Sequence, residues 1–239
     1  MPRVDWEPRA MRYSMCFFPL IGLVVGLLAW GWLSLCAWLG FGDLLRATGV
    51  PLIAVAVTGG IHMDGFADVV DAQSSHAESE RKRAIMKDPH VGAFAVIGVA
   101  FYLLLYVALA SELVDARASW PLLCCLPWMS RCTSGLASVA FPRSGREGML
   151  AAFGDSADKK ASLVALLAEW VLGAAFLLHL SLPVGAVMCA MDLLTLVGMH
   201  RFARTQFGGM SGDLAGFLLQ VAELTMLAGL AIAAKVVML

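Results

Sequence analysis

The sequence predicts an all-α, polytopic integral membrane protein, and three observations support this fold class. Hydrophobic residues occupy 60% of the 239 positions and charged residues only 15%. Several apolar runs reach about 18 residues or more, the length that an α-helix needs to cross a bilayer. These runs do not alternate apolar and polar residues as the strands of a membrane β-barrel do. The formal net charge of −1 gives no reason to expect nucleic acid as a partner.

About seven transmembrane helices are expected, in a single membrane-embedded domain over residues 1–239. The expected spans cover approximately residues 16–39, 47–61, 91–112, 120–140, 161–182, 183–199 and 214–238. The first run is too long for a signal peptide and lacks a small-residue cleavage site, so we expect a retained span. The six cysteines lie in or beside these runs without a C-x-x-C pair. This placement predicts buried thiols instead of a zinc site or a disulfide framework.

The polar segments predict the orientation in the membrane. With about seven spans, the N-terminus and residues 62–90, 141–160 and 200–213 fall on the same side. These segments hold every Lys and Arg except Arg46, Arg117, Arg131 and Lys235. Because Lys and Arg are in excess on the cytoplasmic side of membrane proteins, we expect a cytoplasmic N-terminus and an external C-terminus. The polar segments that could carry chemistry would then face the cytoplasm.

The segment after the second span is unusually acidic for so apolar a chain. If it is helical from His62 onward, Asp64, Asp68 and Asp71 stand at positions i, i+4 and i+7. This spacing places three carboxylates on one helix face, about 6 Å apart between turns. Their mutual repulsion is relieved by a divalent cation, and oxygen-only sites suit Mg²⁺ or Mn²⁺. The alternative is a solvated helix face, neutralised by the basic run 81–83.

A second candidate site is the glycine-rich stretch before the last span. Gly208, Gly209 and Gly212 would let backbone N–H groups approach an anion closely, and a helix begins just after them. A helix N-terminus behind such a turn is a phosphate cradle. Arg201 supplies a cation nearby. Asp213 is either a further metal ligand or the N-cap of the last helix, and taken alone the N-cap is favoured.

Arg131 is a charged residue well inside the expected fourth span. A charge at this depth costs several kcal/mol unless it is paired or faces a wet cavity. One interpretation is a contact with substrate phosphate at the base of a cavity. The other is a structural ion pair with Glu169, Asp192 or Glu223. Carboxylates, basic side chains and a glycine turn are together typical of phosphoryl transfer.

Four segments, in order along almost the whole chain, resemble the cobalamin synthase (adenosylcobinamide-GDP ribazoletransferase) family. Two departures stand out: Ala72 replaces the usual Gly, and no Phe-Thr-Arg-x-Pro-like segment precedes the first span. The glycines of the first matching segment are expected to allow close helix packing. The segments are 17–22; 60–71 with 85–88 and Gly92; 126–131 with 146–148; and 208–213 with Gly216 and Glu223.

The resemblance implies the last step in assembling the nucleotide loop of cobalamin, at a bacterial or archaeal plasma (inner) membrane. α-Ribazole, or its 5′-phosphate, attacks the phosphate of adenosylcobinamide-GDP that is attached to the corrinoid side chain, and GMP leaves. Adenosylcobalamin or its 5′-phosphate forms, and Mg²⁺ is the expected cofactor. Membrane lipid, a second copy of the chain and other enzymes of the corrinoid pathway are the further partners considered.

For this reaction, roles are assigned to the residues as a hypothesis. The aspartates hold one or two Mg²⁺ ions on the pyrophosphate, and Lys87 and Arg131 offset charge on the transferring phosphoryl group and on GMP. Either His62 or Asp88 accepts the proton of the ribose hydroxyl. The candidate residues are His62, Lys87 and Asp88 for catalysis; Arg131, Arg146, Arg201, Gly208, Gly209 and Gly212 for substrate phosphate; and Asp64, Asp68, Asp71 and Asp213 for metal.

Two other functions are compared with this one. A membrane phosphotransferase of the CDP-alcohol type also places Asp-Gly and further aspartates at the membrane face, but its motif expects Ala-Arg after Asp-Gly-x-x. Here Asp68 follows instead. A cation transporter would distribute carboxylates through the depth of several spans, whereas here they cluster in one segment. The sequence leaves open the base that the ribazole carries, the preference for its phosphorylated form, and the identity of the general base.

Overall fold

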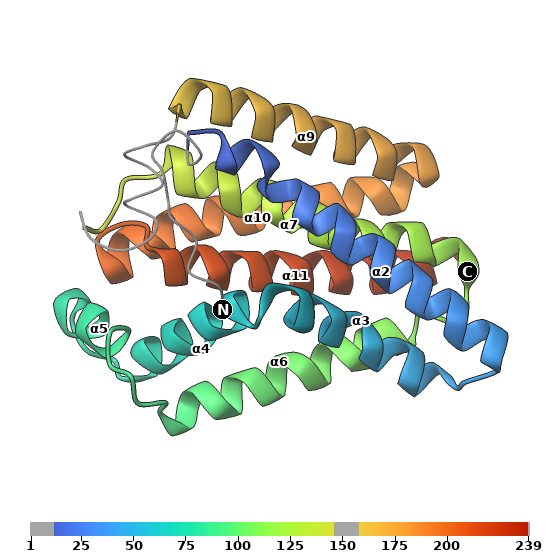
Figure 1. The fold of residues 1–239 in the computed structure, drawn as a ribbon, viewed down its shortest axis with the longest axis horizontal. Coiled ribbons are helices and arrows are strands. Elements are labelled where there is room, and N and C mark those ends of the chain that lie inside the picture. The colour runs from blue at the N-terminus through green and yellow to red at the C-terminus, as the bar shows by residue number, and fades with distance from the viewer. Residues whose placement is uncertain (1–11, 146–157, 239) are drawn as a thin grey trace.

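The computed structural model describes residues 12–145 and 158–238, and in these ranges it is a bundle of helices (Figure 1). The all-α fold class is therefore confirmed. After a 3-10 turn at Ser14–Phe17, the main helices are α2 (Phe18–Leu39), α3 (Asp43–Thr58), α4 (Ile61–Ser74), α5 (Ser79–Ile85), α6 (Ala93–Ser111), α7 (Trp120–Ala140), α9 (Lys159–Leu180), α10 (Leu182–Phe207) and α11 (Gly212–Met238).

Five helices in the described ranges are long and apolar enough to cross a membrane: α2, α6, α9, α10 and α11. Helices α3 and α4 pass the same test only together, as a pair bent by 98° that is either a broken span or a re-entrant loop, and the number rises to six if the pair is counted as one span. Helix α7 is as long as its neighbours but carries several polar residues and is mostly buried. A polytopic membrane protein is thus confirmed, while about seven spans and a cytoplasmic N-terminus remain predictions.

Helix α7 lies inside the bundle, packed against α2, α9 and α11. The contact with α2 is close because Gly22 and Gly26 face the α7 backbone. A Cβ on Gly22 would collide with the carbonyl of Pro127, and a Cβ on Gly26 with the carbonyl of Cys124. Small residues allow this approach of two backbones, as expected for helices packed in lipid. All six cysteines are free, and four of them are buried, as predicted.

The break between α3 and α4 is made by two consecutive glycines in the left-handed region. Gly59 has a φ of 62° and Gly60 a φ of 78°, conformations that side chains with a Cβ rarely adopt. Helix α3 therefore ends at Thr58, and the chain turns before α4 begins at Ile61. The predicted second span over residues 47–61 is thus followed at once by a separate helix that carries the acidic motif.

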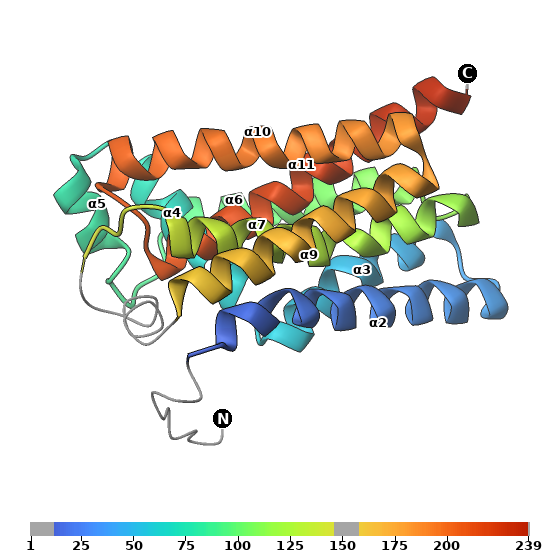
Figure 2. The same cartoon turned by 90° about the horizontal axis from the view of Figure 1, so that it is seen from above.

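The described parts of the predicted polar segments, residues 12–15, 62–90, 141–145, 158–160 and 200–213, lie toward one end of the bundle (Figures 1 and 2). Arg12 pairs with Asp158 across 3.2 Å, which ties the segment before α2 to the start of α9. The turn before α11 is held by backbone hydrogen bonds, in which Met210 N–H donates to the Pro142 carbonyl at 2.8 Å and Ser144 N–H to the Met210 carbonyl at 3.0 Å. The clustering agrees with the expectation that these segments share one side of the membrane.

Candidate active site

Helix α4 displays the three predicted aspartates on one face and an apolar surface on the other. The buried residues of α4 are Gly65, Phe66, Val69 and Ala72. The Phe66 ring stacks on Phe217 of α11 with centroids 5.4 Å apart. Burial of this apolar face fixes the rotation of α4, and the carboxylates are left on its more exposed side.

The fourth predicted carboxylate, Asp213, is brought to this face by α11. Gly65 makes the contact possible, because a Cβ there would lie 2.9 Å from the Cα of Asp213. One turn further along, a Cβ on Gly216 would lie 3.0 Å from the carbonyl oxygen of His62. The two helices therefore meet almost backbone to backbone at the acidic face.

The four carboxylates interact electrostatically. The charge of Asp68 is repelled by those of Asp64, Asp213 and Asp71, and Asp213 also interacts with Asp64. The N-cap of α11 is Ser211, whose hydroxyl accepts the Leu214 N–H at 3.2 Å. Asp213 is therefore not needed as the N-cap, and its carboxylate is available to the cluster.

The donor set can be tested for its fit to a divalent cation. In residues 12–145 and 158–238, no three His, Cys, Asp or Glu side chains are placed so that they would coordinate one ion as they stand. The four carboxylates nevertheless offer only oxygen donors and repel one another, which is the chemistry that favours a hard cation such as Mg²⁺. The start of α6 shapes the site from one side, because a Cβ on Gly92 would collide with the Asp71 carboxylate. The donor atoms are of the type that Mg²⁺ prefers, and the four carboxylate side chains must move closer together to bind one ion.

The two candidate general bases lie in different surroundings. His62 is half-buried in the first turn of α4, where its ring meets the edge of Phe18 at 5.8 Å. Asp88 lies in the exposed loop between α5 and α6, next to Lys87. Its carboxylate accepts the His90 N–H at 3.0 Å and contacts the His90 ring at 2.7 Å. The backbone hydrogen bond, followed by the ring contact, lowers the pKa of Asp88.

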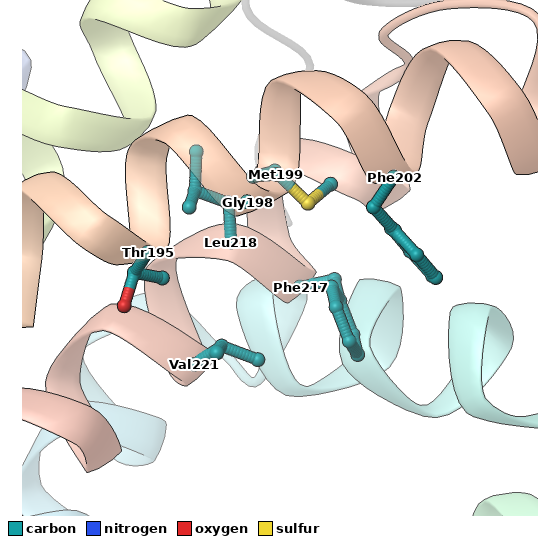
Figure 3. A pocket seen from close by; sticks show the side chains of 7 residues that line it. All are labelled: Thr195, Gly198, Met199, Phe202, Phe217, Leu218 and Val221. Atoms are coloured by element: carbon teal, nitrogen blue, oxygen red, sulfur yellow. The ribbon is translucent and has the colours of Figure 1, made fainter.

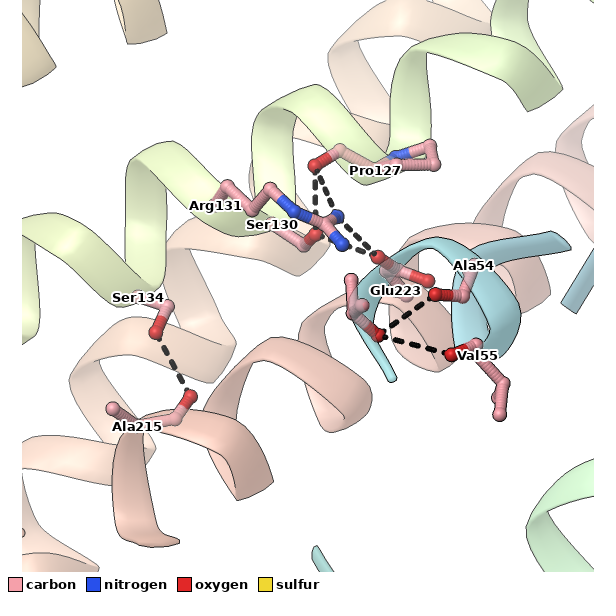
Figure 4. Close-up of polar contacts among 9 residues, drawn as sticks. Ala54, Val55, Pro127, Ser130, Arg131, Ser134, Ala215 and Glu223 are labelled. Atoms are coloured by element: carbon pink, nitrogen blue, oxygen red, sulfur yellow. Dashed lines mark hydrogen bonds and ion pairs between the residues drawn. The ribbon is translucent and has the colours of Figure 1, made fainter. Parts of the chain in front are cut away.

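Arg131 forms a buried ion pair with Glu223 of α11 (Figure 4). Its Nη1 lies 3.3 Å from the Glu223 carboxylate and donates to the Pro127 carbonyl at 2.8 Å. Ser130 donates to the same carboxylate at 2.8 Å. The Arg131 side chain is only 1% exposed, so in this arrangement the guanidinium does not reach a substrate. The structure thus favours the structural pair over the phosphate contact, and Glu223 is the partner among the three candidates.

Backbone N–H groups of the glycine turn already donate hydrogen bonds to carbonyl groups of the chain. Gly209 N–H donates to the Ala203 carbonyl at 3.0 Å, and Gly208, with a φ of 74°, ends α10 in the left-handed region. Since the amides of Gly209 and Met210 are already paired, the expected cradle is reduced to the first turn of α11 at Gly212. Arg201 is exposed on α10, and Arg146 lies outside the described residues.

An apolar groove between α10 and α11 lies apart from the carboxylates (Figure 3). Its volume is about 220 Å³. Phe217, in the wall of the groove, stacks on Phe66 of α4. Phe66 is two residues from both Asp64 and Asp68, so its side chain lies on the opposite side of α4 from theirs. The groove is lined by Thr195, Gly198, Met199, Phe202, Phe217, Leu218 and Val221.

Sequence reasoning missed three features of this site. It did not identify the close contact at Gly65 and Gly216, the cap at Ser211, or the burial of Lys82. The glycines stand inside or beside the matching segments, so their positions were a usable signal. The sequence carried no signal for the cap at Ser211 or for the burial of Lys82, because single serines and short basic runs are common in polar loops.

Known proteins resemble the chain over almost its whole length. The family described as cobalamin-5-phosphate synthase matches residues 1–231. An adenosylcobinamide-GDP ribazoletransferase of Lachnoclostridium phytofermentans is 38% identical over 232 residues, which are 97% of this chain and 87% of the relative. A protein of the same name from Clostridium perfringens is 30% identical, covering 94% and 89%. One from Ectopseudomonas mendocina is 33% identical, covering 94% and 90%. No solved structure matches the chain.

Proposed function

Because the chain belongs to the cobalamin-5-phosphate synthase family, we propose that the carboxylates of Asp64, Asp68, Asp71 and Asp213 form its catalytic centre. The chain is an enzyme of the final nucleotide-loop assembly step of cobalamin, in which α-ribazole or its 5′-phosphate is joined to adenosylcobinamide-GDP. The observation that carries the proposal is the meeting of α4 and α11 at Gly65 and Asp213. It unites carboxylates that are far apart in the sequence.

Mg²⁺ is the cofactor that we assign to this centre. When bound to these carboxylates, it would neutralise charge on the pyrophosphate of adenosylcobinamide-GDP. Asp64, Asp68 and Asp71 would hold it from α4, and Asp213 would hold it from α11. Support comes from the oxygen-only donor set and from the mutual repulsion around Asp68.

The general base for the ribose hydroxyl of ribazole is assigned to His62 or Asp88. His62 stands two residues before Asp64, so its side chain leaves α4 on the other side from the three aspartates. Asp88 is exposed and already accepts hydrogen bonds from His90. In this mechanism the hydroxyl proton passes to the base, the ribose oxygen bonds to the phosphorus atom nearest the corrinoid, and the bond from that phosphorus to GMP breaks. Lys87 offsets the charge on the departing GMP.

The catalytic face is assigned to the cytoplasm, in a bacterial or archaeal plasma membrane. Helix α4 and the start of α11, which carry the four aspartates, lie toward the end of the bundle where α5 is found (Figure 1). All Lys and Arg residues belong to the predicted polar segments except Arg46, Arg117, Arg131 and Lys235, and such an excess marks the cytoplasmic side. This location would bring water-soluble substrates to the site directly.

The proposal is tested with membranes that contain the full-length chain. They receive adenosylcobinamide-GDP, α-ribazole 5′-phosphate and Mg²⁺, and both the corrinoid product and GMP are measured. Equal amounts of the two products are expected, and both should disappear with EDTA and in the Asp64→Asn variant. Undiminished product formation in EDTA would refute the metal assignment. Product formation in well-folded Asp64→Asn at the wild-type rate would refute the site.

A further inference from the structure

Lys82 of α5 is buried, and no carboxylate in the described part of the chain forms an ion pair with it. Only 4% of the residue is exposed, although lysines are rarely buried this deeply unless they are paired. Its Nζ donates to the side-chain oxygen of Gln73 at 2.9 Å and to that of Gln206 at 2.6 Å. It also lies over the ring of Phe207, 5.7 Å from the centroid. An ammonium group is thus enclosed by two amides and an aromatic face.

These contacts join α4, which carries three of the carboxylates, to the end of α10, which leads to the fourth on α11. Gln73 is in the last turn of α4, two residues after Asp71. Gln206 is in the last turn of α10, directly before the turn that leads to Asp213. Helix α5 lies between the ends of α4 and α10 (Figures 1 and 2). Lys82 therefore bridges the helix of the three aspartates to the segment that delivers the fourth.

The neighbouring residue Arg83 strengthens the same connection. Its Nη1 donates to the Phe207 carbonyl at 2.9 Å, one of the carbonyls that the end of α10 leaves without a helical partner. A Cβ on Gly208 would lie 2.9 Å from the same nitrogen. Positive charge at the C-terminal end of a helix is favourable. The basic run of α5 is therefore turned toward the end of α10, not only toward solvent.

We propose that Lys82 is a positioning residue for the metal centre, which it serves by holding the end of α4 against the end of α10. The distance between Asp213 and the aspartates of α4 depends on this connection, because the turn at Gly208 and Gly209 links α10 directly to α11. Lys82 itself touches neither substrate nor metal in this scheme. The inference rests on the proposed function in so far as the positioned carboxylates bind a cation.

The first variant is Lys82→Met, which keeps the apolar stem and removes all three N–H donors. Hydrogen–deuterium exchange of the full-length protein in detergent should become faster both at the end of α4 and in residues 203–213. Equilibrium binding of Mn²⁺, followed by the electron paramagnetic resonance signal of the free ion, should weaken by about tenfold or more, as is typical for loss of a residue that orients ligands. Lys82→Arg, which retains charge and donors, should recover most of the binding.

The matched control is Arg46→Met at the opposite end of the bundle. Arg46 is also a largely buried cation: it pairs with Asp43 of its own helix at 3.1 Å and bridges to Asp115, in the segment after α6, at 3.8 Å. Its loss should lower the unfolding temperature and leave Mn²⁺ binding unchanged. If Lys82→Met does not fold, Gln206→Leu removes the α10 acceptor and should weaken Mn²⁺ binding in the same direction.

The outcomes separate the two proposals. Unchanged Mn²⁺ binding in Lys82→Met, or an equal loss in Arg46→Met, would overturn the positioning role. Faster exchange confined to α5 would also overturn it. A wild-type protein that binds no Mn²⁺ would refute the metal centre of the proposed function, and the exchange data would still decide whether Lys82 joins α4 to α10.

Discussion

Asp68 is the central residue of the carboxylate cluster, because its charge is repelled by those of Asp64, Asp213 and Asp71. The four residues are not equally exposed: Asp64 is exposed, and the other three are half-buried. A cation bound among them would replace repulsion with attraction, so each carboxylate is expected to matter more for metal binding than for folding. Single substitutions can separate these two contributions.

Asp213→Asn should reduce turnover by about a hundredfold or more, since it removes a charge that would stabilise the metal at the reacting phosphate. The thermal unfolding midpoint should remain close to that of the wild type or rise slightly, because repulsion is relieved. Turnover is measured in the product assay and unfolding by circular dichroism in detergent.

Ser211→Ala is the control for this substitution. It removes the hydroxyl that accepts the Leu214 N–H and should cost about 1 kcal/mol of stability. Its turnover at saturating Mg²⁺ should be retained. Should Ser211→Ala lose as much activity as Asp213→Asn, the effect would belong to the start of α11 and not to the carboxylate.

The Arg131–Glu223 pair leads to a second prediction at this scale. Arg131→Met alone should destabilise the protein by about 3–5 kcal/mol, because Glu223 remains buried without a counter-charge. Combining it with Glu223→Gln should restore a large part of the loss, as measured by thermal unfolding. The KM for adenosylcobinamide-GDP in the stable double variant should match the wild type. A strongly raised KM there would instead support the phosphate contact.

At the scale of the helices, α4 is placed by its neighbours at both ends. The break at Gly59 and Gly60 lets it leave the direction of α3 by 98°. Its middle rests on α11 at Gly65, and its last turn is connected to α5 through Gln73 and Lys82. Its own sequence supplies the acidic face, but these contacts decide where that face points.

Gly65→Ala tests the contact between α4 and α11. The added Cβ would lie 2.9 Å from the Asp213 backbone, which cannot move as a flexible side chain does. The helices should therefore separate, and the Mg²⁺ concentration for half-maximal rate should rise by about tenfold. It is read from Mg²⁺ titrations of the product assay.

Gly198→Ala is the matched control in another membrane helix. An added Cβ at Gly198 meets nothing within 4 Å, and it should stabilise α10 by up to about 1 kcal/mol. The Mg²⁺ dependence of this variant should equal that of the wild type. A normal Mg²⁺ requirement in Gly65→Ala would show that the close contact is not needed by the site.

At the scale of the whole molecule, the bundle has two chemically different ends. Helices α4 and α5 and the turn before α11 lie toward one end (Figure 2). Arg46 with Asp115, and Lys235 with Glu112, form ion pairs that lie toward the other end. This polarity is what an enzyme that acts at one membrane surface requires.

The orientation in the membrane can be measured with two exposed side chains at opposite ends. The side chain of His90 is 90% exposed and that of Asp115 is 88% exposed. His90→Cys should react with a membrane-impermeant maleimide only in inverted vesicles, and Asp115→Cys only in intact spheroplasts. The wild type, with its six native cysteines, provides the background. The reverse pattern would place the carboxylate cluster outside the cell.

The sequence by itself determined the all-α membrane class and the acidic face of α4. Both follow from local patterns: apolar length sets a span, and the spacing of Asp64, Asp68 and Asp71 sets one face of any helix that contains them. The break at Gly59 and Gly60 was not predicted, because the expected second span over residues 47–61 ran through both glycines, and the angle of 98° between the helices was not predicted either.

Only the tertiary structure decided which distant residues meet. It paired Arg131 with Glu223 instead of Asp192, and it gave the cap of α11 to Ser211, which leaves Asp213 for the carboxylate cluster. It also showed that Lys82 is buried. The reason is physical: periodicity along a helix depends on neighbours in the chain, whereas a contact between helices depends on how closely their backbones can pack. Helices α4 and α11 pack closely because Gly65 and Gly216 have no side chains at their contact.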